Sequence, residues 1–303
     1  MSRRLWIAAK APRPGLAKTR LAGDLGQAAA LDIYRGFLRD LAARLRGAAF
    51  SIGWYVTPAD AWDDLAPLVG ADSRPRVLDQ GDGDWTLRQR RLLRGAAARG
   101  EARVVLIGSD SPQVRVETIE DAFDQLERRD VVLGPVLDGG YYLIGMRGWH
   151  DVLDGVVMST SSVFRNILAR CQALGCSVGQ VETLFDVDRA DELRQLVALF
   201  PRRDDLAATR AALERYGLIR PFASLLPTTP SAGRRAARDG QGEAVAPRPA
   251  HLGPHSHPTL SQRERERKRG AGAPAGPPAG AAFTLHPSPF NPPEGEGTSV
   301  VAP

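Results

Sequence analysis

Short β-branched runs alternate with amphipathic stretches along the chain as far as residue 216, and this alternation constrains the fold more than any other feature. The expected strands are Leu5–Ala9, Ser51–Thr57, Val104–Gly108, Val131–Pro135, Tyr141–Met146 and Val181–Val187, and the expected helices are Ala28–Leu45, Leu87–Arg99, Val116–Arg128 and Ser162–Leu174. Such alternation predicts an α/β fold with a mainly parallel sheet and helices on both of its faces. In such sheets ligands bind where loops leave the carboxyl ends of the strands.

The composition changes after residue 220. The remaining segment, residues 221–303, has no apolar period and is rich in proline, glycine, alanine and arginine. Because such a segment buries too little apolar surface to offset its chain entropy, we expect it to be disordered. The histidines at 251, 255 and 257 lie there, in a setting that argues against a metal site. The sequence thus predicts one domain over residues 1–220 and a low-complexity tail.

Charge and composition exclude several classes of protein. The net charge is +5, but the tail holds nine Lys/Arg and six Asp/Glu and so contributes +3. The expected domain has little basic excess, which argues against a nucleic-acid partner. Since no run reaches about 18 apolar residues and the first apolar stretch is too short for a signal peptide, we expect a cytoplasmic protein without a membrane span. Cys171 and Cys176 fit neither a redox nor a zinc motif.

Both lysines of the expected domain, Lys10 and Lys18, fall in one loop directly after the first expected strand. A mobile ammonium suits phosphate oxygens, Arg20 adds a third cation, and Gly15 helps to bend the loop over the strand end. The spacing lacks the glycines of a P-loop. The loop is interpreted as a phosphate-binding segment, with a solvated basic loop as the alternative.

Carboxylates follow two of the expected strands. Asp110 comes directly after Val104–Gly108, and Asp186 and Asp188 lie two residues apart near the end of Val181–Val187. Oxygen ligands at such an edge suit Mg²⁺ or Mn²⁺ shared with substrate phosphates. The alternatives are that Asp110 caps a turn and that the later pair caps a helix. The pattern favours Asp110 and one residue of the later pair as metal ligands.

The run Asp138-Gly139-Gly140 separates two apolar segments and precedes Tyr141. By itself it is a strong hairpin signal, but a double glycine also lets a ligand approach the backbone closely. Both interpretations remain open from the residues alone.

Familiar catalytic devices are missing. The expected domain has one histidine, His150, so a Ser-His-Asp triad is not expected, and no nucleophile-elbow or dinucleotide fingerprint occurs. What remains is cations in the first loop and carboxylates at later strand ends. That set is typical of metal-assisted chemistry at phosphate.

Four ordered runs, AKAPRPGLAKTRL, IGSDSP, GPVLDGGYYLIG and DVDRADEL, resemble the bacterial glycosyltransferase-A-like family of arsenosugar-biosynthesis-type glycosyltransferases, which is related to phospholactate guanylyltransferase. The resemblance implies a Rossmann-like nucleotide-diphospho-sugar transferase (GT-A) fold. It also implies the roles of single residues. Phosphate or nucleotide would be bound by Lys10, Gly15, Lys18, Arg20, Gln80 and Gly81, metal by Asp110 and Asp188, and the sugar or acceptor by Asp138, Gly139, Gly140 and Tyr141, with Lys18, Asp110 and Asp138 as the catalytic residues.

Two segments depart from the family pattern. The chain has Asp84-Trp85-Thr86 where Asp-Leu-Gly is common, and Met158-Ser159-Thr160 where Trp-Ser-Thr is common. Both border the donor sugar or acceptor in that family, so the substrate is not carried over. We therefore expect a metal-dependent glycosyltransferase that takes a nucleotide-sugar donor and a small-molecule acceptor. The alternatives are a guanylyltransferase-like nucleotidyltransferase that releases pyrophosphate from a nucleoside triphosphate, and a non-catalytic nucleotide-binding module.

Overall fold

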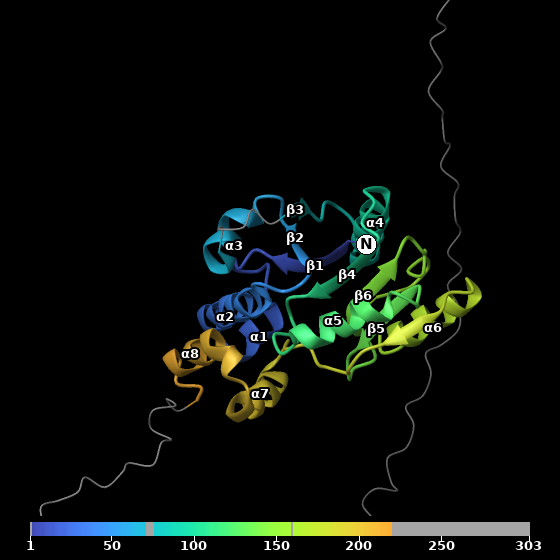
Figure 1. Ribbon diagram of the computed structural model, residues 1–303. Coiled ribbons are helices and arrows are strands. Elements are labelled where there is room, and N and C mark those ends of the chain that lie inside the picture. Colours follow the sequence, from blue (N-terminus) through green and yellow to red (C-terminus); the bar gives the residue numbers. More distant parts are fainter. Residues whose placement is uncertain (1, 71–75, 159, 220–303) are drawn as a thin grey trace, which may run out of the picture. The chain divides into compact units, whose positions relative to one another are not determined.

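A single seven-stranded sheet organises the molecule (Figure 1). The computed structural model describes residues 2–70, 76–158 and 160–219, so the expected tail and its histidines lie outside the described residues. The strand order is β3-β2-β1-β4-β6-β5-β7, and β6 alone among these strands runs antiparallel to its neighbours. The strands are β1 (Arg3–Lys10), β2 (Ser51–Thr57), β3 (Arg76–Asp79), β4 (Arg103–Gly108), β5 (Val131–Pro135), β6 (Tyr141–Arg147) and β7 (Val178–Gln180). The expected mixed, mainly parallel sheet is confirmed.

Helices cover both faces of the sheet, and each face has its own apolar core. On one face α4 (Trp85–Ala98) and α6 (Val163–Ala173) pack on alternate residues of β1, β4, β5 and β6. The other face carries α1 (Thr19–Leu25), α2 (Gln27–Leu45), α3 (Ala61–Val69), α5 (Val116–Gln125), α7 (Ala190–Leu199) and α8 (Ala207–Arg215), with the short 3-10 turns η1 (Phe200–Arg202) and η2 (Asp204–Leu206). Within the described ranges no helix is long and apolar enough to cross a bilayer.

The expected strand Val181–Val187 is wrong as a regular element, because β7 ends at Gln180. The chain does continue beside β5, with hydrogen bonds from Val181 N to the Leu133 carbonyl (3.0 Å) and from Leu184 N to the Pro135 carbonyl (3.0 Å). The register shifts between Gly134 and Pro135, and proline has no N–H to extend the ladder. β3 was not expected, since this four-residue edge strand has exposed ends and no strong apolar alternation.

Helix α8 packs against α2, and a side chain of α2 caps the start of α8. Both oxygens of the buried Asp40 accept hydrogen bonds from the start of α8, from Ala208 N and Thr209 N, each at 2.8 Å. One turn earlier on α2, Gly36 lets the two helices touch, because a Cβ there would lie 2.8 Å from Thr209 Cα. A carboxylate at a helix start satisfies free N–H groups and complements the helix dipole. α8 therefore docks on α2 in one position.

Arg44 of α2 forms a second tie to the same region. Its buried guanidinium donates to the carbonyls of Pro112 (2.7 Å) and Val114 (2.8 Å), beyond β4, and pairs with Asp205 in η2. Asp205 also receives two hydrogen bonds from Arg203 (2.6 and 2.8 Å). Hydrogen bonds from Arg203, reinforced by Arg44, hold the pKa of Asp205 down at about 2.

We expect Gly36→Ala to lower the free energy of unfolding by about 1–3 kcal/mol, because the new methyl group pushes α8 away from α2. Gly23→Ala is the matched control, since its added Cβ meets nothing within 4 Å in α1 and should stabilise the protein by up to about 1 kcal/mol. Urea denaturation measures both. If both substitutions changed the free energy of unfolding equally and in the same direction, the close approach of α8 to α2 at Gly36 would be contradicted.

Asp205→Asn should cost about 1–2 kcal/mol at pH 7, a value reduced for the partial exposure of the carboxylate. Since the folded pKa is depressed from 3.8 to about 2, this stability is present above pH 4 and is lost as the pH falls towards 2. The difference between wild type and variant in chemical denaturation should thus shrink from pH 7 to pH 3. A constant difference would show that the charge is not its source.

Candidate functional site

A pocket of ≈ 630 Å³ opens at the carboxyl ends of β1 and β4, the edge at which the sequence predicts a ligand. It contains most of the residues singled out for chemistry. The lining comprises Ala8, Ala9, Lys10, Leu16, Ala17, Lys18, Thr19, Arg20, Tyr34, Gln80, Gly83, Trp85, Arg88, Gln89, Leu106, Ile107, Gly108, Ser109, Asp110, Tyr141, Tyr142, Asp186 and Asp188. Segments far apart in the sequence therefore meet at one cavity.

Lys18 is the centre of this pocket. Its side chain is only 2% exposed, and its Nζ lies 2.5 Å from Asp110 Oδ1 and 3.3 Å from Asp188 Oδ1 and donates to the Val187 carbonyl (2.8 Å). Burial alone would lower the pKa of Lys18, but the charges of Asp110 and Asp188 outweigh it and leave the pKa raised. One ammonium thus joins the first loop, the end of β4 and the segment after β7.

The backbone of Lys18 is also unusual. It starts α1 in the left-handed region, with φ +50°, and is the one non-glycine residue of the described ranges with a positive φ. Such a conformation costs an ordinary residue about 1 kcal/mol or more and persists where the surroundings impose it. At Lys18 this conformation occurs together with three contacts of the Nζ atom, to Asp110, Asp188 and the Val187 carbonyl.

Asp110 and Asp188 both face the open side of the pocket, with side chains 49% and 43% exposed. Burial opposes ionisation of Asp110, but the Lys18 ammonium outweighs it and holds the pKa of Asp110 below its ordinary value. Burial, then the negative charge of Asp110, raises the pKa of neighbouring Asp186 to about 7, and the Ser111 hydroxyl donates to this carboxyl. Asp186 and Asp188 share the pocket although they do not lie on a regular strand.

The donor set fits a small divalent cation that completes its coordination elsewhere. No group of three or more His, Cys, Asp or Glu side chains is arranged as a ready-made metal site in the described part of the chain. Asp110 and Asp188, however, both touch the same Nζ and keep exposed oxygens. Mg²⁺ is commonly bound by only one or two carboxylates together with substrate phosphates and water. The two aspartates are therefore suited to an ion that is shared with substrate phosphates, not to one that protein side chains enclose completely.

Tyr34 of α2 aligns the two strand ends beneath the pocket. Its hydroxyl accepts from Lys10 N (3.1 Å) and lies 2.9 Å from Ser109 Oγ. Because the ring is fully buried, the pKa of Tyr34 is raised, so the hydroxyl stays neutral. In the sequence Tyr34 is simply one residue of the expected helix Ala28–Leu45, and nothing in its spacing indicates this contact with the first loop.

The remaining predicted residues divide between the pocket and its surroundings. Lys10, Arg20, Gln80 and Tyr141 line the pocket; Gly15, Gly81, Asp138, Gly139 and Gly140 are not among its lining residues. Gln80 Nε2 donates to the Tyr55 carbonyl (2.8 Å), and its Oε1 accepts from Arg88 (3.3 Å). The side chain of Gln80 is thus held by protein partners at the pocket wall.

Asp138 and the two glycines form the turn between β5 and β6, as the hairpin interpretation predicts. Asp138 Oδ1 accepts from Gly140 N (2.9 Å), and Gly139 has φ +91°. A Cβ on Gly139 would collide with the carbonyl oxygen of Ser161. The double glycine therefore has a packing reason, and the catalytic role of Asp138 stays a prediction.

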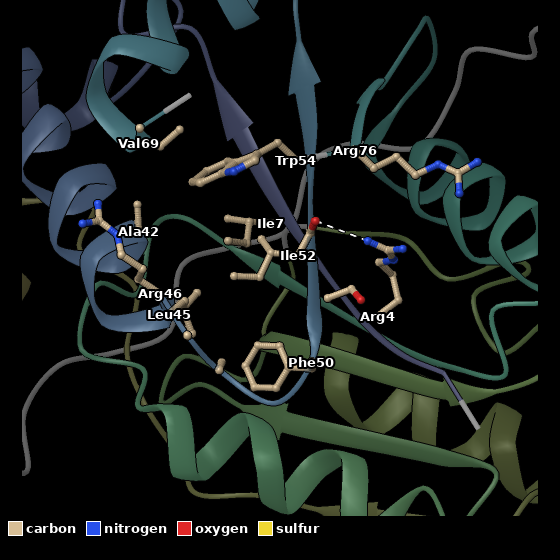
Figure 2. A pocket seen from close by; sticks show the side chains of 14 residues that line it. Arg4, Ile7, Ala42, Leu45, Arg46, Phe50, Ile52, Trp54, Val69 and Arg76 are labelled. Carbon is tan, nitrogen blue, oxygen red and sulfur yellow. Dashed lines mark hydrogen bonds between the residues drawn. The ribbon is translucent and has the colours of Figure 1, made fainter. Parts of the chain in front are cut away.

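A second pocket, of ≈ 710 Å³, lies at the opposite edge of the sheet, at the amino ends of β1 and β2 (Figure 2). Ile7, Leu45 and Ile52 gather on one side of β2, whereas Arg4 and Arg76 lie on the other (Figure 2). Its lining residues include no carboxylate, histidine or cysteine. Size therefore does not identify the site; the chemistry of the lining favours the smaller pocket.

Comparison with known proteins bears on the fold and on the family resemblance. The family model described as "Uncharacterized protein conserved in bacteria (DUF2064)" matches residues 40–160. A crystal structure from Desulfovibrio desulfuricans G20, of a protein provisionally named a nucleotide-diphospho-sugar transferase, is 29% identical, with a TM-score of 0.64 over 71% of this chain and 99% of that one. These findings confirm the expected resemblance and the nucleotide-diphospho-sugar transferase fold. No curated protein matches the chain.

More distant structures give weaker alignments. A nucleotidyl transferase from Methanothermobacter thermautotroptrophicus is 15% identical, with a TM-score of 0.45 over 67% of this chain and 99% of that one. The CTP complex of CMP:2-keto-3-deoxy-manno-octonic acid synthetase is 12% identical, with a TM-score of 0.43 over 67% and 99%. Similarity at this level does not separate one transferase reaction from another.

Lys18→Met should lower the free energy of unfolding by about 2 kcal/mol, since it leaves the carboxylates without their cation; their exposure keeps the loss below that of a fully buried pair. Arg20→Met is the control, because Arg20 is 64% exposed and reaches Asp188 only at 3.4 Å. Its loss should cost less than about 0.5 kcal/mol. Thermal and urea denaturation measure both, and equal losses would contradict the central position of Lys18.

Proposed function

We propose that the protein is a metal-dependent glycosyltransferase that uses a nucleotide-diphospho-sugar donor. The observation that carries the proposal is the meeting of Asp110 and Asp188, through Lys18, at the mouth of a pocket that also exposes Lys10 and Arg20. The 29% identity to the D. desulfuricans protein that is provisionally named a nucleotide-diphospho-sugar transferase, over 99% of that chain, supports this class of substrate.

Asp110 and Asp188 would hold Mg²⁺ or Mn²⁺. When bound, the ion would offset the charge that develops on a departing diphosphate. Asp110 suits this role because the pKa of its carboxyl is lowered, so it is ionised at neutral pH. Lys18, fixed between the two carboxylates, sets their positions before any substrate arrives, which is the preorganisation that such a site needs.

Other residues of the chain would bind and orient the substrate. Lys10 lies close enough to Asp110 to help lower the pKa of that carboxyl, and Arg20 is largely exposed beside Asp188. Both cations therefore suit the phosphates of a donor next to the two aspartates. Gln80 would lie near the base, and Tyr141 on the sugar or acceptor side. The turn that precedes Tyr141, formed by Asp138, Gly139 and Gly140, would serve the same sugar or acceptor side.

The proposal is tested by identifying which bond breaks. A glycosyltransferase cleaves the sugar–phosphate bond and releases a nucleoside diphosphate, whereas a nucleotidyltransferase cleaves at the α-phosphorus of a triphosphate and releases pyrophosphate. Water often replaces the acceptor slowly in a site that positions its donor. We expect ³¹P NMR to show slow, Mn²⁺- or Mg²⁺-dependent release of nucleoside diphosphate from at least one nucleotide-sugar, and EDTA to stop it.

Asp110→Asn should reduce this release at least about a hundredfold, because a neutral amide replaces a charged metal ligand. Asp191→Asn is the matched control: this exposed carboxylate lies three residues from Asp188, outside the pocket, and its loss should leave the rate unchanged. Pyrophosphate release from triphosphates plus phosphorylated hydroxy acids, with nucleotide-sugars intact, would replace the proposal by a nucleotidyltransferase. Binding without turnover in both panels would favour a non-catalytic module.

A further inference from the structure

Gln89 of α4 carries an amide with an unused hydrogen-bond donor at the pocket. The residue is fully buried, yet it belongs to the lining of the pocket. Its Oε1 accepts a hydrogen bond from the Tyr141 hydroxyl (2.8 Å), whereas its Nε2 has no partner among the described residues. Buried polar groups are nearly always paired, because an unpaired one loses its hydration without compensation. An unpaired donor at a cavity wall therefore points to an acceptor on a ligand.

The surroundings of Gln89 differ from the charged end of the pocket. Trp85 precedes Gln89 by one helical turn on α4 and also lines the pocket, and Tyr141 forms the adjoining wall on β6. Burial raises the pKa of Tyr141, which keeps its hydroxyl neutral and able to donate to Gln89. Trp85, Gln89 and Tyr141 combine two aromatic rings with one amide and carry no formal charge, whereas Arg88 of the same helix, which also lines the pocket, donates to Gln80 Oε1 (3.3 Å). The three uncharged residues suit an uncharged ring that carries oxygen atoms, not a phosphate.

The start of α4 and the segment around Met158, which are far apart in the sequence, meet at this wall. The Tyr141 hydroxyl lies 3.8 Å from Met158 Sδ, and Thr86 Oγ1 donates to the Val156 carbonyl (3.2 Å), which ties the start of α4 to the segment before Met158. Two separate stretches of sequence thus border one amide.

We propose that Gln89 is a specificity-determining residue whose Nε2 donates a hydrogen bond to a carbonyl or hydroxyl oxygen on the uncharged part of the substrate, either the base or the sugar. Tyr141 is the positioning residue that orients the amide. The inference rests on the proposed function, because it takes the ligand of this pocket to be a nucleotide or nucleotide-sugar.

The test compares wild type with Gln89→Met, which keeps the length of the side chain and removes the amide. Calorimetry with Mn²⁺ gives Kd for UDP-, ADP- and GDP-glucose, for GDP-mannose and GDP-fucose, for the free diphosphates and for CTP and GTP. We expect Gln89→Met to weaken the preferred ligand about tenfold or more and the others less, so that selectivity falls. A loss shared by the free diphosphate assigns the acceptor to the base; a loss confined to the sugar conjugates assigns it to the sugar.

Thermal denaturation separates recognition from support of the fold. Because Gln89→Met and Tyr141→Phe both break the hydrogen bond from the Tyr141 hydroxyl to Gln89 Oε1, both should lower the Tm to a similar extent. Gln89→Met alone removes the Nε2 donor, so it should lower selectivity more than Tyr141→Phe does. All ligands weakened equally by Gln89→Met, or the same loss of selectivity in both variants, would overturn the inference alone. Wild type that binds triphosphates but no nucleotide-sugar would overturn the glycosyltransferase proposal and leave Gln89 testable on the triphosphates. Wild type that binds no nucleotide would overturn both.

Discussion

The Lys18 ammonium is the interaction on which the site depends. It is buried and touches Asp110 and Asp188, and the residue that carries it starts α1 in the left-handed region. Without this cation, carboxylates from two remote segments would repel one another at close range. Lys18 thus lets acidic residues gather where an ion and a phosphate would later meet them, and the local strain is held by contacts made far away in the sequence.

Beneath this cluster the sheet supplies a fixed edge. Tyr34 links the ends of β1 and β4, and Arg44 ties the segment beyond β4 to the C-terminal part of the chain. These links are neutral or fully paired. The pocket above them, in contrast, has an exposed pair of aspartates and, at Gln89, an amide donor without a partner. At Gln89 a ligand could complete the pairing, whereas the buried Gln113 Oε1, which also has no partner among the described residues, lies outside the pocket.

The central sheet could be predicted because its strands are buried β-branched runs, and β2 and β5 have the expected bounds. The edge strand β3 could not, because a half-exposed strand has little apolar signal. Asp110 and Asp188 could be placed at one edge because each follows an apolar segment expected to be a strand, although the second segment is not a regular strand. That Lys18 would bind them could not, because the contact joins residues up to 170 positions apart. The Asp138 turn shows a second limit of sequence reasoning. Its two glycines are explained by close packing, which the Asp-Gly-Gly motif alone does not reveal.

The break in the ladder at Pro135 has a consequence for how such a molecule can change. Beyond that residue the segment carrying Asp186 and Asp188 follows the sheet through isolated backbone hydrogen bonds, and Val187 N reaches the Asp110 carbonyl (2.9 Å). The segment follows the sheet but is not one of its strands. Substitutions in this segment can therefore retune Asp186 and Asp188 with little penalty to the sheet, whereas Asp110, two residues beyond the end of β4, is tied to the sheet. Evolution and protein engineering can thus adjust one half of the acidic cluster separately from the scaffold.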